Sequence, residues 1–430
     1  MQNFYLLNYI QKISNIDDEI LDSLRFELDQ NIYHYGAQFK HPKEKQNRAR
    51  KLLDARSYLI QLKYLYVLYR TLFHELTPRD DQKPDIISNA YFSVNGELRK
   101  LGFNVHCPLW NISCRETLLA DWDCFRACMS VKKSILGSNF RELIDSKFLE
   151  KIKQLKNLLR GYFTKHHVSA LIVPNDISFF ENLSIRIFKE IRKPSFVFLH
   201  GLPGRYNSVD DNRADYLVVW GEKIKDHYVK CGFDSHKIFV SGHPFYKTPA
   251  HRNLRFSLES ILIITKGMNG AQHSDCVRLA DRGNMILYLY VIESVLKRMG
   301  VRSVHFRPHP SENSNWYFKF IDNEFYKIDD EDLGTSLSRS TLVIGPTSTV
   351  FLEALYYGVN YVCFEPSIED IDLLNFPLVP PFDGSDERVP VARNEEELEN
   401  IIKRNVLVNL EVFDDYIKTP FDLSFIKTMI

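Results

Sequence analysis

The sequence predicts an α/β protein with two Rossmann-like, doubly wound domains that face a cleft. From about residue 83 onward, short apolar runs alternate with segments of helical periodicity, which is the pattern of parallel strands joined by helices. The alternation stops once, over 245–258, where the chain is basic, contains proline and has no periodicity. A chain of 430 residues, 44% of them hydrophobic, is long enough for two cores of ordinary size.

These observations divide the chain into five parts. We expect a helical segment over 1–82 that packs on the first domain, the first Rossmann-like domain over 83–244, a linker over 245–258, the second Rossmann-like domain over 259–410, and a closing segment over 411–430 that can cross back to the first domain. A helix is expected near 55–75, because leucines recur there at spacings of three and four residues. This stripe predicts a helix face in the core rather than a face for a partner, and its members are Leu59, Leu62, Leu65, Leu68 and Leu72.

The expected elements follow from the same two periodicities. In the first domain the apolar runs predict strands at 84–88, 103–108, 170–174, 196–200, 216–220 and 237–241. The segments between them predict helices at 95–101, 143–166, 179–191 and 222–231. In the second domain strands are expected to open at 261, 301, 341 and 361, with helices at 282–299, 350–358 and 395–404.

The segment 341–358 is the strongest indication of function. An apolar strand ends at a Gly-Pro break, and three hydroxyl residues then begin a helix, namely Thr347, Ser348 and Thr349. The free N–H groups and positive dipole end of such a helix favour an anion, and the hydroxyls can donate to phosphate oxygens. Glu353, one turn further along, could accept hydrogen bonds from both hydroxyls of a ribose. The alternative is a well-capped helix with a solvent-facing glutamate.

Two further strand ends point to the same edge of the second sheet. The run 301–310 ends in an Arg-Pro-His-Pro sequence that displays Arg307 and His309, and open parallel sheets bind ligands at the carboxyl ends of their strands. A guanidinium can hold a phosphate through two hydrogen bonds, and an imidazole can donate one or carry a proton. A glycine-containing stretch follows the strand that opens at 261, so Lys266 and Gly267 join the predicted phosphate site. The sequence has no GxxxxGKS or GxGxxG pattern, which disfavours a P-loop or a dinucleotide site.

Together these motifs carry a resemblance to a known group of enzymes. The RPHP strand end and the G-x-T-S-T-V-x-L-E-A-L-x-x-G segment resemble the donor-nucleotide half of GT-B glycosyltransferases, especially bacterial sialyltransferases, polysialyltransferases and capsule Kdo-transferases with their HP and S/T-S/T motifs. Similar motifs occur in CDP-glycerol polymerases of the teichoic-acid type. The resemblance implies that His309, Ser348 and Thr349 contact the phosphate and nucleotide of the donor. The acidic-acidic-glycine motif of the sialyltransferases is not evident in its usual form, so the resemblance fixes neither the sugar nor the base.

Transfer to a sugar hydroxyl also needs a group that accepts the hydroxyl proton. In the first domain, loops after strands offer Asp176 as first choice, His200 as second and Glu181 as third. The alternatives are that Asp176 caps the following helix and that His200 hydrogen-bonds a buried backbone carbonyl. The residues expected to contact the acceptor are Gly201, Arg205 and His243, the last at a second His-Pro strand end.

Charge and composition exclude several classes of protein. Lys plus Arg equals Asp plus Glu at 55 each, so nothing indicates nucleic acid as a partner. The N-terminal residues have neither a basic n-region nor a long apolar core, so we expect a cytoplasmic protein, with peripheral contact to the inner face of the membrane left open. The seven cysteines are not spaced as a disulfide framework or a zinc knuckle, although Cys124 and Cys128 lie four apart.

Acidic patterns could bind a metal ion, and two of them match the DxD motif by letter. These are Asp121-Trp122-Asp123 and Asp370-Ile371-Asp372, and neither clearly follows a strand. The basic and helix-end groups of the predicted phosphate site could neutralise a leaving phosphate without an ion, so we predict no essential metal and no cofactor. The acidic run 329–332 is expected to be a solvated loop or a helix start.

The sequence therefore predicts a metal-independent glycosyltransferase. It would move a sugar from a nucleotide-activated donor, with CMP-activated sialic acid or Kdo favoured, to a hydroxyl of an oligosaccharide or glycolipid in bacterial surface polysaccharide synthesis. The alternatives are a GT-B transferase that uses a UDP-sugar, a non-hydrolysing sugar-nucleotide 2-epimerase, a CDP-glycerol-type polyol-phosphate transferase, and a non-catalytic nucleotide- or carbohydrate-binding relative.

Overall fold

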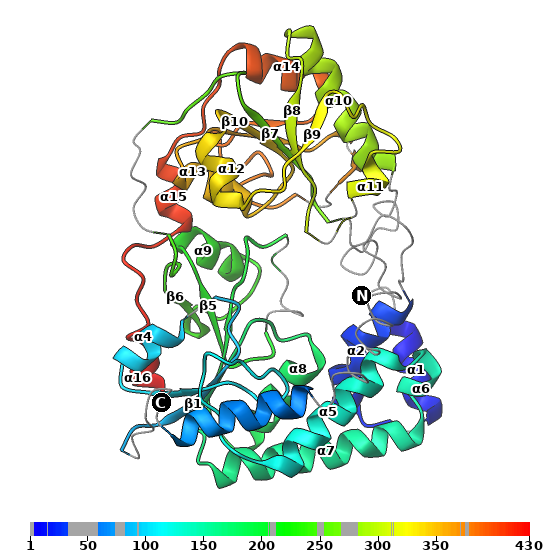
Figure 1. Cartoon of the computed structure of the whole chain (residues 1–430), viewed down its shortest axis with the longest axis vertical. Coiled ribbons are helices and arrows are strands. Elements are labelled where there is room, and N and C mark those ends of the chain that lie inside the picture. Colours follow the sequence, from blue (N-terminus) through cyan, green and yellow to red (C-terminus); the bar gives the residue numbers. More distant parts are fainter. Residues whose placement is uncertain are drawn as a thin grey trace.

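The computed structural model describes residues 4–14, 16–32, 59–73, 82–92, 94–204, 206, 212–246, 253–267, 283–310, 312, 314–369, 371–374 and 378–430. Within these residues two β-sheets with parallel strands lie one above the other, and helices pack around each of them (Figure 1). This arrangement confirms the predicted fold class of two doubly wound α/β units.

The first sheet has the strand order β2-β1-β3-β4-β5-β6, and its pairings are all parallel. Its strands are β1 (Asp85–Ser88), β2 (Asn104–His106), β3 (Ala170–Val173), β4 (Ser195–Phe198), β5 (Tyr216–Val219) and β6 (Ile238–Val240). The helices of this unit are α1 (Phe4–Ser14), α2 (Asp18–Ile32), a helix over 59–72, α4 (Asn95–Lys100), α5 (Trp122–Gly137), α6 (Phe140–Leu143), α7 (Ser146–Lys165), α8 (Phe179–Glu190) and α9 (Glu222–Lys230). The inner strands are buried on both faces, which is why they appear in the sequence as continuous apolar runs.

The second sheet has the order β14-β11-β10-β7-β8-β9 and is also parallel. Its strands are β7 (Ile261–Ile264), β8 (Val304–Arg307), β9 (Tyr326–Ile328), β10 (Leu342–Gly345), β11 (Tyr361–Phe364) and β14 (Val391–Ala392). Around it lie α10 (Gly283–Arg298), α11 (Ser314–Tyr317), α12 (Leu333–Arg339), α13 (Val350–Tyr356) and α14 (Glu395–Lys403), and the antiparallel pair β12 (Ser367–Ile368) and β13 (Ile371–Asp372).

Each sheet has one topological switch point, at which the order of the strands reverses. In the first sheet it lies between β1 and β3, because β2 is on one side of β1 and the later strands are on the other. In the second sheet it lies between β7 and β10, because β8 and β9 are on one side of β7 while β10, β11 and β14 are on the other. Open parallel sheets bind ligands outside the carboxyl ends of their strands at such points. The loops after these four strands are therefore where topology predicts a site.

The chain crosses between the two units twice. It passes upward between β6 and β7, and after α15 (Glu411–Tyr416) it runs back down beside the first sheet to α16 (Ile426–Met429) (Figure 1). On the way the Lys418 N–H donates to the Trp220 carbonyl at 2.8 Å, and the Phe425 ring stacks on Phe239 with centroids 4.5 Å apart. A Cβ on Gly242, whose φ is +80°, would lie 2.2 Å from the Lys418 carbonyl oxygen, so this close return requires glycine.

The prediction that the leucine stripe lies in the core is wrong. Leu59, Leu62, Leu65 and Leu72 are between 41% and 63% exposed, and only Leu68 is partly buried. The helix over 59–72 instead buries Tyr64 and Val67. Both faces of this helix are apolar, so its periodicity defines two stripes and does not say which one meets the core. No helix in the part of the chain that the structure describes is long and apolar enough to span a bilayer.

Candidate functional site

The switch point of the second sheet brings together a lysine and a threonine. Lys266 follows β7 and Thr347 follows β10, and these neighbouring strands end side by side. The Lys266 Nζ donates a hydrogen bond to the Thr347 Oγ1 at 2.9 Å. Burial lowers the pKa of the Lys266 ammonium, and the charge of Glu365 opposes this shift. A partly desolvated cation at strand ends can pair strongly with a phosphate.

Glu365 lies directly after β11, and its carboxylate interacts with both Thr347 and Lys266. Its side chain is fully buried, and its Oε1 accepts a hydrogen bond from the Thr347 N–H at 2.6 Å. The Oε2 atom has no hydrogen-bond partner among the described residues. Burial raises the pKa of Glu365, whereas Lys266 lowers it. The Thr347 N–H, which the sequence predicts to be open to a phosphate, is thus already held by a carboxylate.

The other two hydroxyls of this turn are also engaged. The Ser348 Oγ accepts from the Val350 N–H at 3.2 Å, and the Thr349 Oγ1 accepts from the Leu202 N–H at 3.0 Å. Each hydroxyl oxygen accepts one bond, so its own hydrogen can still be donated to a phosphate. The helix α13 is only seven residues long, and Gly358 follows it with a φ of +69°, the left-handed conformation predicted for it.

His309 lies at the next strand end, after β8, on a loop fixed by buried polar groups. Its side chain is exposed, while its N–H donates to the Thr265 Oγ1 at 3.0 Å and to the Glu312 Oε2 at 3.2 Å. Glu312 is buried and also accepts from the Tyr317 hydroxyl at 2.7 Å. Partial burial and then the positive charge of Lys266 lower the pKa of His309. The histidine and the lysine therefore lie in one electrostatic neighbourhood.

Arg307 has a different orientation from the one that its strand end predicts. Its Nη1 donates to the Glu331 carbonyl at 2.6 Å and lies 3.9 Å from the Asp329 Oδ1. Burial raises the pKa of Glu353, while a hydrogen bond from the Tyr246 hydroxyl and the charge of Arg307 lower it. Glu353, the predicted ribose ligand, is therefore bound by a tyrosine from the segment between the two sheets.

The two units meet at strand-end loops. Leu202 follows β4 in the first sheet and Thr349 follows β10 in the second, and the hydrogen bond between them joins positions 147 residues apart. A Cβ on Gly201 would lie 3.0 Å from the Thr349 Oγ1, whereas Gly204 has open space around it. The predicted acceptor loop and the predicted donor loop are thus in contact, and Gly201 permits their close approach. Arg205 lies outside the described residues.

His200 lies next to this junction. Its ring is exposed, and its Nδ1 lies 3.2 Å from the Pro174 carbonyl oxygen. The predicted alternative of a carbonyl partner is therefore present, but the ring as a whole stays open to solvent. Of the three base candidates, it is the one whose side chain is exposed beside the second unit.

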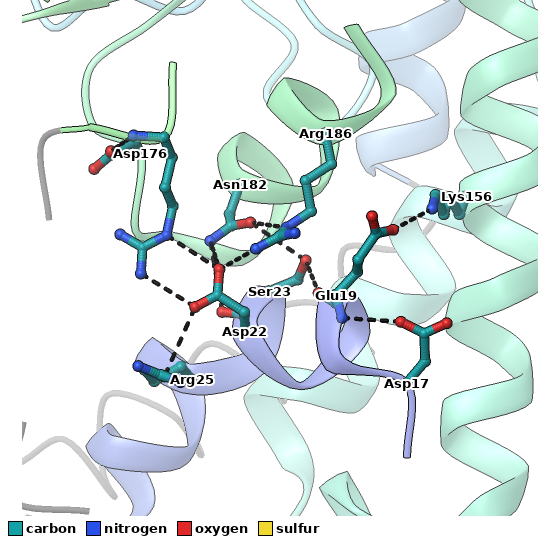
Figure 2. A network of polar contacts seen from close by, with 10 residues as sticks. Asp17, Glu19, Asp22, Ser23, Arg25, Lys156, Asp176, Asn182 and Arg186 are labelled. Carbon is teal, nitrogen blue, oxygen red and sulfur yellow. Dashed lines mark hydrogen bonds and ion pairs between the residues drawn. The ribbon is translucent and has the colours of Figure 1, made fainter. Parts of the chain in front are cut away.

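Asp176 lies in a buried network rather than at an open strand end. It is 1% exposed, and its Oδ2 accepts from the Arg213 N–H at 2.8 Å. The Arg213 side chain continues to Asp22 on α2, with Nε and Oδ2 3.1 Å apart. Figure 2 shows Asp22 at the centre of this network, with Asn182 and Arg186 of α8 pointing toward it. This placement does not favour Asp176 as the base.

The same network fixes α2 against α8. Burial raises the pKa of Asp22, but its hydrogen bond and ion pair with Arg213, and the charge of Arg186, outweigh this and hold the pKa well below its usual range. Asp176 does not cap α8 either, because the N-cap of this helix is Ser178, which makes no side-chain cap hydrogen bond. The Ser178 N–H donates to the Asn175 Oδ1 at 2.9 Å, in the turn before the helix. The predicted alternative of a cap at Asp176 is therefore wrong.

Glu181 lies at the switch point of the first sheet. Its Oε1 accepts from the Asn89 Nδ2 at 2.8 Å and from the Trp110 Nε1 at 3.3 Å, so it links the loops after β1, β2 and β3. Burial raises the pKa of Glu181, while these hydrogen bonds and the charge of Lys132 lower it. Glu27 of α2 lies close enough for the two carboxylates to interact. The side chain is 8% exposed and is held in one orientation.

His243 is enclosed by aromatic rings between the two units. It is 2% exposed, stacks on Tyr246 with centroids 4.1 Å apart, and meets the edges of Phe92 and Trp220 at 4.2 and 4.6 Å. Its Nδ1 accepts from the Phe245 N–H at 3.3 Å. Burial lowers the pKa of His243 to about 3, so the ring is neutral. With so little exposed surface, the ring is not placed to contact an acceptor in the way that the sequence predicts.

The acidic and cysteine patterns prove to have local structural roles. Asp121 is the N-cap of α5 and accepts from the Cys124 N–H, and Asp372 pairs with Arg393. Asp370 lies outside the described residues. Cys124 and Cys128 are buried in the core, and in the described ranges no group of three metal-ligating side chains is found.

The acidic run 329–332 differs in part from its prediction. Asp332 caps α12 by accepting from the Thr335 N–H at 3.0 Å, which confirms the expected helix start. Asp329 is buried instead of solvated, and its Oδ1 lies 3.1 Å from the Arg339 Nη2. Two arginines of the same unit thus compensate its charge.

Several polar residues of the site are absent from the sequence prediction. Glu365 and Asn89 each directly follow a strand, at positions where the rule applied to the other strands could have found them. Glu27, Trp110 and Tyr246 come from segments with no motif, so only their contacts identify them. Of the predicted glycine loop after β7, Lys266 and Gly267 are described, and the residues from 268 to 282 are not.

Comparison with known proteins finds similarity at the level of structure only. Neither a protein-family model nor a curated protein sequence matches the chain. Among solved structures, it is similar to a UDP-GlcNAc 2-epimerase from Methanocaldococcus jannaschii in complex with UDP-GlcNAc and UDP, with 13% identity, 80% of this chain and 96% of that chain covered, and a TM-score of 0.44. It is also similar to a UDP-GlcNAc 2-epimerase from Neisseria meningitidis bound to UDP-GlcNAc, with 11% identity. That match covers 80% of this chain and 98% of the epimerase chain, with a TM-score of 0.44. A third similar structure is a lipopolysaccharide outer core galactosyltransferase in its apo form, with 12% identity. That match covers 80% of this chain and 97% of the galactosyltransferase chain, with a TM-score of 0.41. At these values the likeness says nothing of substrate, which depends on the site itself.

Proposed function

We propose that this protein is an enzyme that acts on a nucleotide-activated sugar, whose phosphate binds at the switch point of the second sheet. The observation that carries the proposal is the hydrogen bond from Lys266 to Thr347 across this switch point, with His309 nearby. A cation, an imidazole and the hydroxyls of Ser348 and Thr349 then lie at one strand edge, and together they can neutralise and hold a leaving phosphate. The proposal needs no divalent ion.

We propose that the first unit supplies the acid–base group. In transfer, an acceptor hydroxyl oxygen would bond to the anomeric carbon, the bond from that carbon to the donor phosphate would break, and a base would take the hydroxyl proton. His200 is exposed next to the contact between Gly201 and Thr349, and Glu181 lies at the first switch point. The exposure of His200 and the position of Glu181 at the first switch point support a role in proton transfer better than does the place of Asp176 in the network with Arg213 and Asp22.

The identity of the donor nucleotide is proposed separately from the position of its phosphate. The sequence interpretation favours a CMP-activated sugar, but no contact in the described part of the chain distinguishes one phosphate from two. UDP and UDP-GlcNAc are named for two of the solved structures above, so they belong in the same ligand panel as CMP.

A second candidate function is epimerisation of a sugar nucleotide without an acceptor. It is supported by the two carboxylates Glu181 and Glu27, which lie close together at the first switch point and have raised pKa values. A buried acid–base pair can remove a carbon-bound proton on one side of a sugar and return it on the other. The products separate the two functions, because epimerisation gives a new sugar nucleotide and transfer releases the nucleotide.

The first test is a thermal-shift panel of CMP, CDP, UDP, GDP and UDP-GlcNAc, with and without EDTA, on the wild type and on His309→Ala. A ligand that binds only the folded state raises its stability according to its concentration and affinity. Stabilisation by one nucleotide that falls in His309→Ala and persists in EDTA is the expected result. If no nucleotide stabilises the wild type, the proposed phosphate site is wrong. NMR of the stabilising sugar nucleotide, alone and with glycan acceptors, then distinguishes epimerisation from transfer.

A further inference from the structure

The helix over 59–72 has an exposed side on which large apolar residues are concentrated. We call this side the apolar helix face, and its members are Leu59, Leu62, Leu65, Tyr66, Tyr69, Leu72 and Phe73, each between 41% and 63% exposed. The opposite side is well packed, because Tyr64 stacks on Phe125 of α5 with ring centroids 4.4 Å apart. The helix is therefore fixed in place with seven large apolar side chains directed outward. A patch of this kind marks a binding surface.

The charges around the apolar helix face are mainly positive. The segment 59–73 contains Lys63 and Arg70 and no acidic residue. Beside it, a groove of about 540 Å³ is lined by residues of this helix and of α5, with Ile60, Phe125 and Met129 as apolar lining. Arg126 and Lys133 also line this groove, against one acidic residue, Asp123. An apolar strip is thus flanked by four basic side chains. Three of them are exposed, and the fourth, Arg70, is partly exposed and donates to the Cys114 carbonyl at 2.9 Å.

The aromatic residues of this surface are of the kind found where a protein meets a bilayer. Tyr66 and Tyr69 are about half exposed, and Trp122 of α5 is 38% exposed and packs edge-on to Tyr64. Tyrosine and tryptophan combine an apolar ring with a polar atom and are enriched at the level of lipid headgroups. A helix with one apolar face, flanked by basic residues, can lie in the plane of the bilayer interface.

We propose that the apolar helix face, with the basic groove beside it, docks this protein on an anionic lipid bilayer. The apolar side chains would enter the headgroup region, and Lys63, Arg70, Arg126 and Lys133 would face the negative surface. A second copy of the chain fits less well, because a twofold interface would set this basic surface against itself. The surface is distinct from the proposed phosphate site and does not depend on it.

One consequence rests on the proposed function. Lys132, next to Lys133 on α5, donates to the Trp110 carbonyl at 2.8 Å and interacts with Glu181. The groove and the first switch point therefore share α5, so docking would bring the first unit close to a lipid-linked acceptor.

The test is flotation with vesicles of phosphatidylcholine alone or of equal parts phosphatidylcholine and phosphatidylglycerol, at low and high salt. The apolar variant is Leu62→Ser/Tyr66→Ser/Tyr69→Ser, and the charge variant is Arg126→Glu/Lys133→Glu. The matched controls are Leu407→Ser/Ile368→Ser, which are also exposed apolar residues, and Arg302→Glu/Lys319→Glu, all in the second unit. Because the substituted side chains are on the surface, thermal unfolding should change little, and this is measured on every variant.

We expect the wild type to bind the anionic vesicles, with about tenfold or more weaker binding in each test variant and at high salt, and no change in the controls. Equal binding to neutral vesicles, or equal loss in the controls, would overturn the proposal. So would a monomer that binds neither vesicle, or a concentration-dependent dimer that the apolar variant abolishes. Nucleotide stabilisation measured on the same variants should be unchanged, which separates failure here from failure of the proposed function.

Discussion

At the switch point of the second sheet an ammonium group bonds to a hydroxyl, whereas at that of the first sheet a carboxylate accepts from an amide and an indole. In both places a hydrogen bond links the segments that follow the two strands flanking the switch point. The second position has Lys266, His309 and three hydroxyls. The first has Glu181 and Glu27. The same topology thus positions the proposed anion-binding site in one unit and the proposed acid–base site in the other.

The difference between the two positions is also one of burial. His309 is exposed and Lys266 is partly accessible, so these two groups of the second switch point are less buried than Glu181. Glu181 is 8% exposed, and the side chains around it fix its orientation. Proton transfer benefits from such fixed, desolvated groups because burial brings a carboxyl pKa closer to neutrality. The comparison predicts that changes at the second position reduce ligand binding and that changes at the first reduce turnover.

The largest expected effect is that of Lys266→Met, about a thousandfold loss in kcat/KM together with loss of nucleotide stabilisation. The variant leaves Glu365 buried without its cation and should also be less stable. Lys266→Met/Glu365→Gln removes both charges and should regain stability without regaining activity. Thermal shift and turnover are measured on both variants and on Lys223→Met, an exposed lysine that serves as control. Full activity in the double variant would rule out Lys266 as a phosphate ligand.

Glu181→Gln should lower kcat by about a hundredfold while nucleotide stabilisation is unchanged. The glutamine keeps an oxygen that can accept from Asn89 and Trp110, so the fold should be preserved. Glu222→Gln is the control, because Glu222 occupies the first turn of α9 as Glu181 occupies that of α8. If nucleotide binding falls and kcat does not, the proposed division of roles between the two switch points is wrong.

Glu27→Gln should stabilise the protein by about 1 kcal/mol above pH 8 and have no effect near pH 4. Burial raises the pKa of Glu27 to about 7, with a lowering contribution from the Phe179 N–H and a raising one from Glu181. The folded state therefore holds the proton more tightly than the unfolded state. The contribution of Glu27 to stability is greatest below its unfolded pKa near 4.5 and is lost as the pH rises through its folded pKa of about 7. Urea unfolding across this pH range is the measurement, with Glu396→Gln, at an exposed glutamate of α14, as control. An equal gain at both pH values would contradict the assignment.

Gly201→Ala is expected to have the smallest effect, a few-fold loss of activity with little change in thermal stability. The added Cβ would lie 3.0 Å from the Thr349 Oγ1 and would push apart the loops through which the two units meet. Gly204→Ala, three residues along and without close neighbours, is the matched control. Turnover and thermal unfolding are compared for the pair. Equal activity in both variants would mean that this contact has no part in the reaction.

The sequence by itself determined the fold class and the strand ends that carry the proposed phosphate site. Short apolar runs, helix periodicity and the Gly-Pro break depend on neighbours along the chain, so β10, α13 and the left-handed Gly358 could be predicted locally. The placement of Lys266, His309 and Thr347 at one edge followed from the rule for parallel sheets. Their catalytic or binding roles stay predictions until they are tested.

Only the tertiary structure decided which of these groups are buried, paired or exposed. The contact between Leu202 and Thr349, the carboxylate of Glu365 under the Thr347 N–H, and the burial of Asp176 all depend on residues distant in sequence. The leucine stripe shows the same limit, since periodicity identifies an apolar face but not what covers it. The physical reason is that desolvation and pairing are set by the whole surroundings of a side chain, which no local pattern contains.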